Sequence, residues 1–518
     1  MLKIDLNNFD NFVVVNSIPQ SKFKLSLSSI EEYIFISKNA GSNKVLTTTA
    51  NDIKTVDKNT VEQVRNFLIQ KYPDLLRKAL GSNATKKELK KIINEYLSKA
   101  EHLQIKGMSL DELSTALLNA IAGLGVIDAI LEEQKKEDIT DIRFNGKDIW
   151  IYSNTRLPYK SHRKLSRKEA ADLAMKIAFA TNKEFSSTII ELDAEISNLR
   201  VNAVHESVSS GTCLAFRVMT RGVRITEDNF IKTLGSQTML DFLVACVKSK
   251  ISIAVTGETG TGKTELIKFL MKFILGHHPI NVIEDTPETY AQELYPEKDI
   301  CNWFTKKSSS GAVEVDITRL LRSALRNNPS WLVITESRGG EMIDILKAAG
   351  TGHAVMTSFH TDSTQSSSNR IVLMAKESSS LDEELIQTLI PDAFRIVAHI
   401  EYDTVSQKRR IAGLGEYVGM DIENNTVNTE DLFGYTVDGA SFVEKDGVMV
   451  LETKRSFKQL SVMSDKLAEH FIANGVLTPS LISLLSNEIK EKYKISHFQD
   501  QNNAGENESF FTFEQQIS

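Results

Sequence analysis

The spacing of hydrophobic residues predicts a helical domain over residues 56–135. Apolar positions in this stretch recur three and four residues apart, as they do on the buried face of an amphipathic helix. Capping boxes, in which a hydroxyl residue is followed three positions later by Glu or Gln, occur at Thr60/Gln63, Thr85/Glu88 and Ser109/Glu112. We therefore expect a helix to begin at each pair.

The pattern changes to short strand-like runs over residues 136–222. Residues 139–154 hold two such runs on either side of an Asn-Gly pair, which is the strongest short signal for a β-hairpin. A capping box beginning at Ser166 predicts one helix, and further strand-like runs follow it. We expect an α+β domain here.

The rest of the chain divides by composition. A polar segment, residues 223–235, is expected to be a linker, and residues 236–435 alternate short apolar runs with helical segments. Residues 1–55 are a poorly defined N-terminal segment. Residues 436–518 are expected to form a C-terminal accessory region that ends in a flexible polar tail.

Four short apolar runs within residues 236–435 each stop at residues that can take part in chemistry. The runs are ISIAV before a glycine-rich loop, INVI before Glu284 and Asp285, WLVIT before Glu336, and AVMTSF before His360. Runs of this length, separated by helical segments, are typical of a mostly parallel sheet, so the predicted fold class is α/β. Ligands of such sheets bind at the carboxyl ends of the strands, where we expect these residues to meet.

The glycine-rich loop, GETGTGKT, matches the phosphate-binding pattern GxxxxGK[ST]. It lies between an apolar run and the helical segment ELIKFLMKFIL, which is the order of elements that the pattern requires. In such a loop, backbone N–H groups surround phosphates, a lysine neutralises charge and a hydroxyl binds magnesium. The expected nucleotide-binding residues are Gly257, Glu258, Thr259, Gly260, Thr261, Gly262, Lys263 and Thr264, the last also as a Mg²⁺ ligand.

The carboxylates at the strand ends are candidates for catalysis. Phosphoryl transfer requires charge compensation, a magnesium ion and a positioned water molecule. Glu284, Asp285 and Glu336 can each supply a carboxylate, and Asp285 and Glu336 are also candidate metal ligands. The sequence does not decide which of them positions the water. His360 is expected near the terminal phosphate, where it would donate a hydrogen bond or respond to phosphate loss.

A second histidine, His353, precedes the run that ends at His360. A zinc site is excluded by ligand count, because no HExxH motif, nearby cysteine or third ligand accompanies the pair. We expect His353 to contribute to nucleotide binding as a loop partner at the preceding turn. An ordinary core or surface histidine is the alternative.

Composition indicates a multidomain globular protein. The chain has 518 residues, a formal net charge of -7 and three cysteines. The acidic balance argues against a protein that coats nucleic acid, and cysteines without a CxxC pair fit a reducing, cytosolic compartment. No stretch approaches the roughly 18 apolar residues of a spanning helix, so any membrane association is expected to be peripheral.

Four ordered motifs resemble those of the type II/type IV secretion ATPases, or traffic ATPases, in the branch that serves conjugation and tight-adherence pili. GETGTGKT resembles the family's phosphate-binding loop, VIEDTPE its Asp box, LRNNPSWLVITESRGGEMIDILKAAGTGH its Walker B region and SFHTDS its His box. The likeness covers roughly residues 139–435. It implies a RecA-like P-loop NTPase core and a preceding PAS-like α+β domain, to which the helical spacing of residues 56–135 adds an N-terminal helical extension.

The resemblance also implies a function. The chain would be an ATP- and Mg²⁺-dependent hexameric motor of a secretion, conjugation or pilus-assembly machine, bound to platform proteins at the cytoplasmic face of the inner or plasma membrane. Segments LRVNAV and LAFRV look like those that carry nucleotide-contacting arginines in the family, which makes Arg200 and Arg217 candidate ATP ligands. An ordinary ion pair is the alternative for each arginine.

Two positions depart from the family pattern. Thr335 replaces the usual glycine before Glu336, and Ser337 replaces the usual hydrophobic residue after it. A nucleotide-gated assembly scaffold with little turnover is therefore one alternative function. A translocase acting directly on DNA is another, although the acidic balance and the lack of a basic, aromatic-rich stretch disfavour direct nucleic-acid binding.

Overall fold

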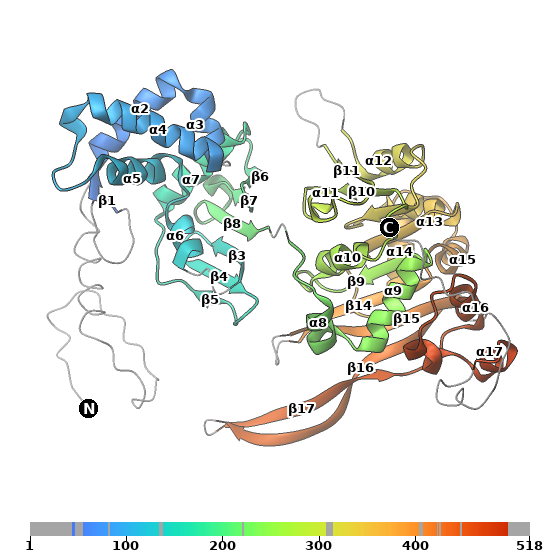
Figure 1. The fold of residues 1–518 in the computed structure, drawn as a ribbon. Helices are drawn as coiled ribbons and strands as arrows, with labels where there is room; N and C mark the ends of the chain where they lie inside the picture. The colour runs from blue at the N-terminus through green and yellow to red at the C-terminus, as the bar shows by residue number, and fades with distance from the viewer. Residues whose placement is uncertain are drawn as a thin grey trace, which may run out of the picture. The chain divides into compact units, whose positions relative to one another are not determined.

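The structure is a computed structural model. It describes residues 44–46, 55–80, 83–133, 138–219, 222–306, 314–403, 408–421, 423, 426–445 and 448–495. The expectations for most of residues 1–55, and for the polar tail after residue 495, lie outside these ranges. Figure 1 shows the remaining elements in chain order, from helices in blue to the C-terminal helices in red.

Helices dominate the first part of the described chain. The elements are β1 Lys44–Leu46, β2 Thr55–Asp57, α2 Lys58–Lys71, α3 Pro73–Ala79, α4 Asn83–Lys99, η2 Glu101–Leu103, α5 Leu110–Ala122 and α6 Val126–Glu133. Apolar side chains from α2, α4 and α5, among them Leu68, Ile93 and Leu117, form one buried cluster. This packing is what the helical spacing of apolar residues predicts.

The capping boxes in this part predict one helix start of three correctly. Ser109 caps α5, because its Oγ accepts from the Glu112 N–H at 3.2 Å while Glu112 accepts from the Ser109 N–H at 2.7 Å. The start expected at Thr60 is wrong, because Asp57 caps α2 by accepting from the Thr60 N–H at 2.9 Å. The start expected at Thr85 is also wrong, because α4 already begins at Asn83.

Residues 139–218 contain a six-stranded sheet. Its strands and their helix are β3 Ile139–Phe144, β4 Ile149–Ser153, β5 Tyr159–Lys160, α7 Arg167–Ala180, β6 Glu191–Ile196, β7 Leu199–Val204 and β8 Cys213–Val218, and the strand order is β5-β4-β3-β8-β7-β6. The predicted hairpin is confirmed, since β3 and β4 pair antiparallel and Gly146 takes a left-handed φ of 85° in the turn. The capping box at Ser166 is confirmed at the start of α7.

A nine-stranded sheet organises the chain after residue 250. Its strands are β9 Ile253–Thr256, β10 Ile280–Glu284, β11 Ile300–Phe304, β12 Trp331–Ile334, β13 Ala354–Phe359, β14 Ile396–Asp403, β15 Lys408–Asp421, β16 Thr426–Lys445 and β17 Val448–Gln459. The order is β11-β10-β12-β13-β9-β14-β15-β16-β17. The strands from β9 to β14 are parallel, as predicted, whereas β15 to β17 add antiparallel strands.

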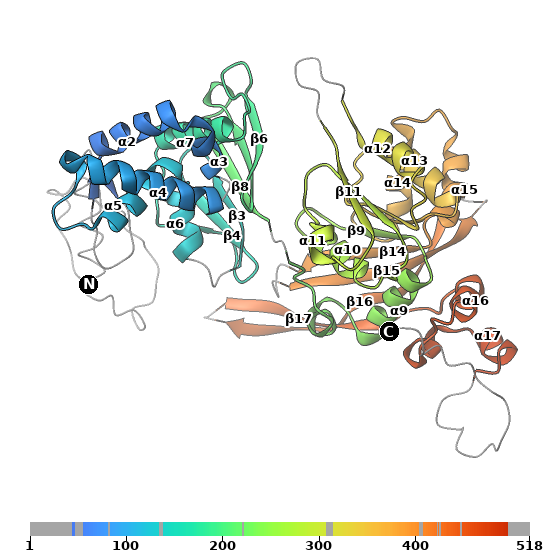
Figure 2. The ribbon, with the colours of Figure 1, turned by 45° about the horizontal axis from the view of Figure 1, so that its top comes forward.

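Helices cover both faces of the parallel strands (Figures 1 and 2). They are α9 Gln237–Lys248, α10 Lys263–Met271, α11 Ala291–Leu294, α12 Ile317–Ala324, α13 Met342–Gly350, α14 Ser367–Lys376, α15 Glu383–Ala393, α16 Asp465–Ala473, η5 Pro479–Leu484 and α17 Asn487–Lys492. Val333 packs in a core cluster with residues of α9 and α10, and its neighbour Ile334 packs in another with residues of α13 and α15. Burial on both faces explains why these strands are continuously hydrophobic.

Two segments that were expected to lie outside the large domain pack into its core. Residues 223–235 contain α8 Glu227–Asn229 and a π-helical turn, Phe230–Leu234, rather than a free linker. Phe230 is fully buried, and its ring lies 5.7 Å from that of Phe269 in α10. In the C-terminal region, Phe471 of α16 belongs to the same cluster.

One sequence expectation concerned membrane spans. Within the described ranges, no single helix is long and apolar enough to cross a membrane; α5 and α6 together reach that length and hydropathy but are bent by 114°. The apolar side chains of α5 instead contribute to the buried helical cluster, as Leu113 and Leu117 do.

Candidate active site

The glycine-rich loop connects β9 to α10, in the predicted order of strand, loop and helix. Gly257, Gly260 and Gly262 have φ values of 144°, 80° and 102°, in the region that favours glycine. A Cβ atom at Gly257 would lie 2.2 Å from the carbonyl oxygen of Ile400 in β14. The glycines are therefore required by backbone shape, because the loop turns sharply and passes close to the neighbouring strand.

Lys263 is buried beneath this loop, and its ammonium group donates hydrogen bonds to backbone carbonyls of the loop. Its Nζ donates to the carbonyl oxygens of Gly257 at 2.9 Å and Glu258 at 2.8 Å. Burial lowers the pKa of Lys263 to about 8, and the nearby Glu336 carboxylate partly offsets this effect. A positive charge thus lies inside the loop, as the phosphate-binding pattern predicts.

The remaining loop residues differ in exposure. The side chains of Glu258 and Thr259 are exposed at the tip, whereas Thr261 is buried and its Oγ1 donates to the Glu258 carbonyl at 2.9 Å. Thr264 is half-buried as the second residue of α10. Its hydroxyl therefore lies in the first turn of the helix that follows the loop, and the pattern predicts a magnesium ligand at this position.

His360 joins the loop lysine to the carboxylate at the end of β12. Its Nδ1 lies 3.1 Å from Lys263 Nζ, and its Nε2 lies 3.0 Å from Glu336 Oε1. Nδ1 also lies 3.1 Å from the Gly257 carbonyl oxygen, and because a carboxylate can only accept, Nε2–H donates to Glu336. His360 and Glu336, which follow different strands, therefore meet next to the loop lysine, as expected.

An arginine that the sequence analysis did not single out continues this line of contacts. Arg338 Nη2 donates to Glu336 Oε2 at 2.7 Å, and its Nη1 lies 3.5 Å from Asp285 Oδ2. Burial alone would raise the pKa of Glu336, but hydrogen bonds and charge from Arg338 and His360 hold it below its ordinary value. Glu336 is therefore a carboxylate at neutral pH.

The turn after Glu336 is fixed by a second carboxylate. Glu341 Oε1 accepts from the Ser337 hydroxyl at 2.9 Å and from the Arg338 N–H at 2.6 Å. Thr335, the other departure from the family pattern, is buried, and its carbonyl accepts from Ser358 Oγ at 2.6 Å. Both unusual residues are thus held by hydrogen bonds that keep Glu336 at the strand end.

Glu284 has a different environment from the other candidate carboxylates. It is buried, and it accepts hydrogen bonds from the N–H of Thr289 at 3.0 Å, the hydroxyl of Thr289 at 2.8 Å and the N–H of Glu288 at 3.2 Å. Burial raises the pKa of Glu284 to about 7 in spite of these bonds. Its carboxyl group therefore holds the turn at Glu288 and Thr289, and it is not one of the groups that contact Glu336.

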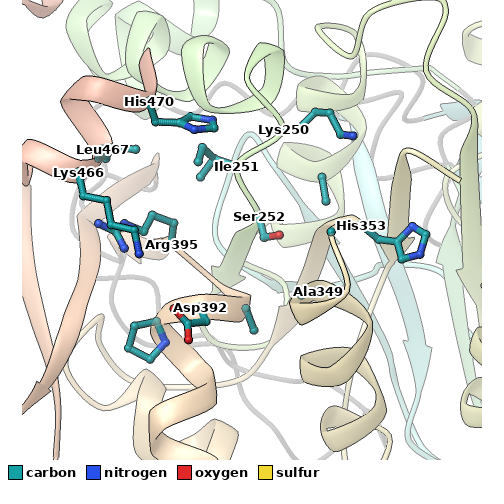
Figure 3. Close-up of a pocket in the computed structure, with 14 residues that line it drawn as sticks. Lys250, Ile251, Ser252, Ala349, His353, Asp392, Arg395, Lys466, Leu467 and His470 are labelled. Carbon is teal, nitrogen blue, oxygen red and sulfur yellow. The ribbon is translucent and has the colours of Figure 1, made fainter. Parts of the chain in front are cut away.

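The structure does not bring His353 to the glycine-rich loop. His353 lies just before β13 and His360 just after it, so the strand separates them to opposite edges of the sheet. The His353 ring donates to the Pro329 carbonyl at 2.8 Å. It also lines a pocket of about 250 Å³ at that other edge, together with Lys250, Arg395 and others (Figure 3).

The two arginines that were compared with family ligands lie in the six-stranded sheet. Arg200 is on β7 and Arg217 is on β8. Arg217 Nε donates to Asp141 Oδ1 of β3 at 3.2 Å, which is the ion pair that was the alternative for this residue. A phosphate contact for either arginine remains a prediction.

Arg409 is a further loop contact with no signal in the sequence. It lies on β15, and its guanidinium donates from Nε at 3.2 Å and from Nη2 at 3.1 Å to the Gly260 carbonyl. The two residues are 149 positions apart, and the KRR segment around Arg409 has no motif of its own. Arg338, in contrast, could have been noticed from its place two residues after Glu336.

Comparisons with known proteins agree on one family. The model of the family described as Type II/IV secretion system protein matches residues 134–410, just over half of the chain. An uncharacterised Bacillus anthracis protein is 30% identical over 79% of this chain and 88% of its own length. The Type IV secretion system protein VirB11 of Brucella suis is 30% identical over 36% of this chain and 52% of its own length.

One solved structure that the chain resembles is also named for an ATPase. The Legionella pneumophila ATPase DotB is 21% identical over 58% of this chain and 82% of its own, with a TM-score of 0.42. The extent of the family match, together with the long Bacillus anthracis relative, decides the assignment. This chain belongs to the type II/IV secretion system protein family.

Proposed function

We propose that this protein is an ATPase that supplies energy to a secretion, conjugation or pilus-assembly machine. The observation that carries the proposal is the line of contacts from Lys263 through His360 to Glu336, which joins the glycine-rich loop to two other strand ends. Such an arrangement supplies the positive charge, the polar sensor and the carboxylate that phosphoryl transfer requires. Several relatives are named as type IV secretion system proteins, which supports the transport role.

Each residue of the site has a proposed task. The loop amides and Lys263 bind the β- and γ-phosphates, which requires Lys263 to exchange its two carbonyl contacts for phosphate oxygens. Glu336, held ionised by Arg338 and His360, accepts a hydrogen bond from the attacking water and orients it. His360 donates to the terminal phosphate or to Glu336 according to whether that phosphate is present.

The residues present fit a magnesium ion that arrives with the nucleotide. Within the described ranges, no group of three or more His, Cys, Asp or Glu side chains could hold a metal by itself. Mg²⁺ in nucleotide sites takes most of its ligands from phosphates and water, with one or two carboxylates from protein. Asp285 and Glu336 are the proposed carboxylates, and Thr264 would add its hydroxyl. When bound, the ion neutralises charge that develops on the phosphate oxygens.

The assembly and its location are part of the same proposal. The nine-stranded sheet and its helices form the proposed RecA-like core, residues 136–222 a PAS-like domain, and the preceding helices an N-terminal extension. Six copies form a ring at the cytoplasmic face of the membrane, where platform proteins of the machine bind it. Arg200 and Arg217 contact ATP when the PAS-like domain closes on the core.

The decisive experiment compares phosphate release by the wild type and by Lys263→Ala in magnesium and in excess EDTA. We expect magnesium-dependent release from the wild type and a loss on the order of 100-fold in the variant, as for removal of other single charge-stabilising donors. Equal rates in the two proteins would refute ATP hydrolysis at this loop. Negligible release from a wild type that binds ATP would favour the assembly scaffold, and release that rises with added DNA would favour a translocase.

A further inference from the structure

The carbonyl groups of the glycine-rich loop need partners of their own. When loop N–H groups point inward to phosphates, the carbonyls of the same peptide units point outward, where they bond to side chains or to water. Lys263 Nζ donates to the carbonyls of Gly257 and Glu258. The carbonyl of Gly260 is instead bound from outside the loop, by two donors of Arg409.

Several contacts fix the Arg409 side chain in this place. Its guanidinium lies over the ring of Tyr402 in β14, 5.3 Å from the ring centroid. Its Cδ is also close to the loop, since a Cβ atom at Gly262 would lie 3.3 Å from it. The arginine therefore contacts the loop at both Gly260 and Gly262 from strands of the same sheet.

The two cations that bind loop carbonyls differ in what happens when nucleotide arrives. In the proposed function, Lys263 turns to the phosphates and leaves the carbonyls of Gly257 and Glu258. Arg409 lies on β15, outside the loop, and its two donors to the Gly260 carbonyl are not among the contacts that Lys263 has to exchange. Both donors share the single Gly260 oxygen, and hydrogen bonds from a charged donor are stronger than those between neutral groups.

We propose that Arg409 is a positioning residue that holds the tip of the glycine-rich loop in its phosphate-binding shape, with and without nucleotide. The proposal rests on the proposed function for the identity of the ligand. Arg409 acts through Gly260 and does not take part in the chemical step. It should therefore affect nucleotide affinity and loop mobility more than the rate at saturating ATP.

The next residue provides a matched control. Arg410 occupies the same strand but has different surroundings, with its Nε 3.8 Å from Asp403 Oδ2 and its guanidinium 4.3 Å from the ring centroid of Tyr435. Arg410→Gln removes the same charge from β15 without touching a loop contact. Any effect of charge alone should appear in both variants.

The test measures wild type, Arg409→Gln, Arg409→Lys and Arg410→Gln as full chains. We expect Arg409→Gln to weaken binding of fluorescent ADP about tenfold and to raise KM for ATP similarly, while kcat changes less than threefold. Arg409→Lys keeps the charge but not the paired donors, and should fall between. Hydrogen exchange of the peptide covering residues 256–265, in protein without nucleotide, should be faster in Arg409→Gln than in Arg410→Gln.

The possible results distinguish a failure of the positioning role of Arg409 from a failure of the proposed ATPase function. Equal ADP affinity and equal exchange in Arg409→Gln and Arg410→Gln would overturn the positioning role while leaving ATP hydrolysis by the wild type intact. A large fall in kcat with unchanged ADP affinity would overturn it too, because Arg409 would then act in the chemical step. If the wild type fails to bind ADP, the proposed function fails, and the exchange comparison alone still decides whether Arg409 holds the loop. Should Arg409→Gln not fold, Arg409→Lys against Arg410→Gln decides by the same measurements.

Discussion

Glu284 and Glu336 show how the surroundings of a carboxylate determine its chemistry. Both end parallel strands that point toward the same edge of the sheet. Glu336 contacts a guanidinium and an imidazole, which lower its pKa, whereas Glu284 is enclosed by uncharged donors and burial raises its pKa to about 7. The first is suited to orient water, and the second is suited to close a loop.

The same substitution at these two positions should therefore have different effects. Glu336→Gln removes the charge that orients water with little change of shape, so we expect kcat to fall on the order of 100-fold with ADP affinity unchanged. Glu284→Gln keeps an acceptor for the N–H of Thr289, so kcat should stay within about threefold. Steady-state kinetics and ADP titration measure both. The reverse ranking would assign water positioning to Glu284.

Glu284 should also make stability depend on pH. Its folded-state pKa of about 7 lies above the ordinary value of 4.5, so the stabilisation is full below the ordinary value and is lost as pH rises through about 7. We expect Glu284→Gln to gain stability relative to wild type between pH 5 and pH 8, on the order of 1–3 kcal/mol.

Urea unfolding followed by tryptophan fluorescence, to which the fully buried Trp331 contributes with Trp150 and Trp303, measures this gain in protein without nucleotide. Glu336→Gln is the control, because the Glu336 pKa is lowered and its contribution stays constant above pH 6. Parallel pH curves for wild type and Glu284→Gln would mean that the Glu284 carboxyl is not buried in the way described.

At the scale of helices and strands, short sequence signals predicted helix starts correctly where the capping contacts join residues close together in the chain. The capping boxes at Ser109 and Ser166 were predicted correctly, because both halves of such a box lie within four residues. The box at Thr60 did not form because Asp57, three residues earlier, accepts from the Thr60 N–H, which the Gln63 side chain would accept from in the expected box. His353 was expected to contribute to nucleotide binding from the turn before β13; it does precede that strand, whereas the loop follows the carboxyl end of β9.

The segment from Thr226 to Leu234 was expected to be part of a linker because most of its residues are polar, but two of its apolar residues are buried. Phe230 and Leu234 are buried, while Ile231 between them is 39% exposed. We expect Phe230→Ala to destabilise the nine-stranded unit by about 3–5 kcal/mol, as for other buried Phe to Ala changes, and Ile231→Ala to cost less than about 1 kcal/mol. Urea unfolding followed by tryptophan fluorescence checks both. A cost below 1 kcal/mol for Phe230→Ala would restore the interpretation of a free linker.

At the scale of the whole molecule, the sequence predicted the parallel sheet and that residues following different strands meet, but not every contact that they make. Continuous apolar runs predict burial on two faces, and the direction of parallel strands then places Lys263, Glu336 and His360 together. Arg409 could not be predicted in this way. It reaches the loop from β15, one of the antiparallel strands that extend the sheet beyond its parallel part.

The proposed ring predicts that turnover depends on how many chains meet. If ATP is hydrolysed only when subunits assemble, phosphate release per chain should rise with protein concentration and level off once assembly is complete. Sedimentation velocity with a non-hydrolysable ATP analogue should then show a species of six times the chain mass of 57.9 kDa. Lys263→Ala, which loses the charge that binds phosphate, should not assemble in response to the analogue. Constant activity per chain together with a monomeric mass at every concentration would mean that one chain forms a complete site, and the hexamer would have to be abandoned while the ATPase proposal stands.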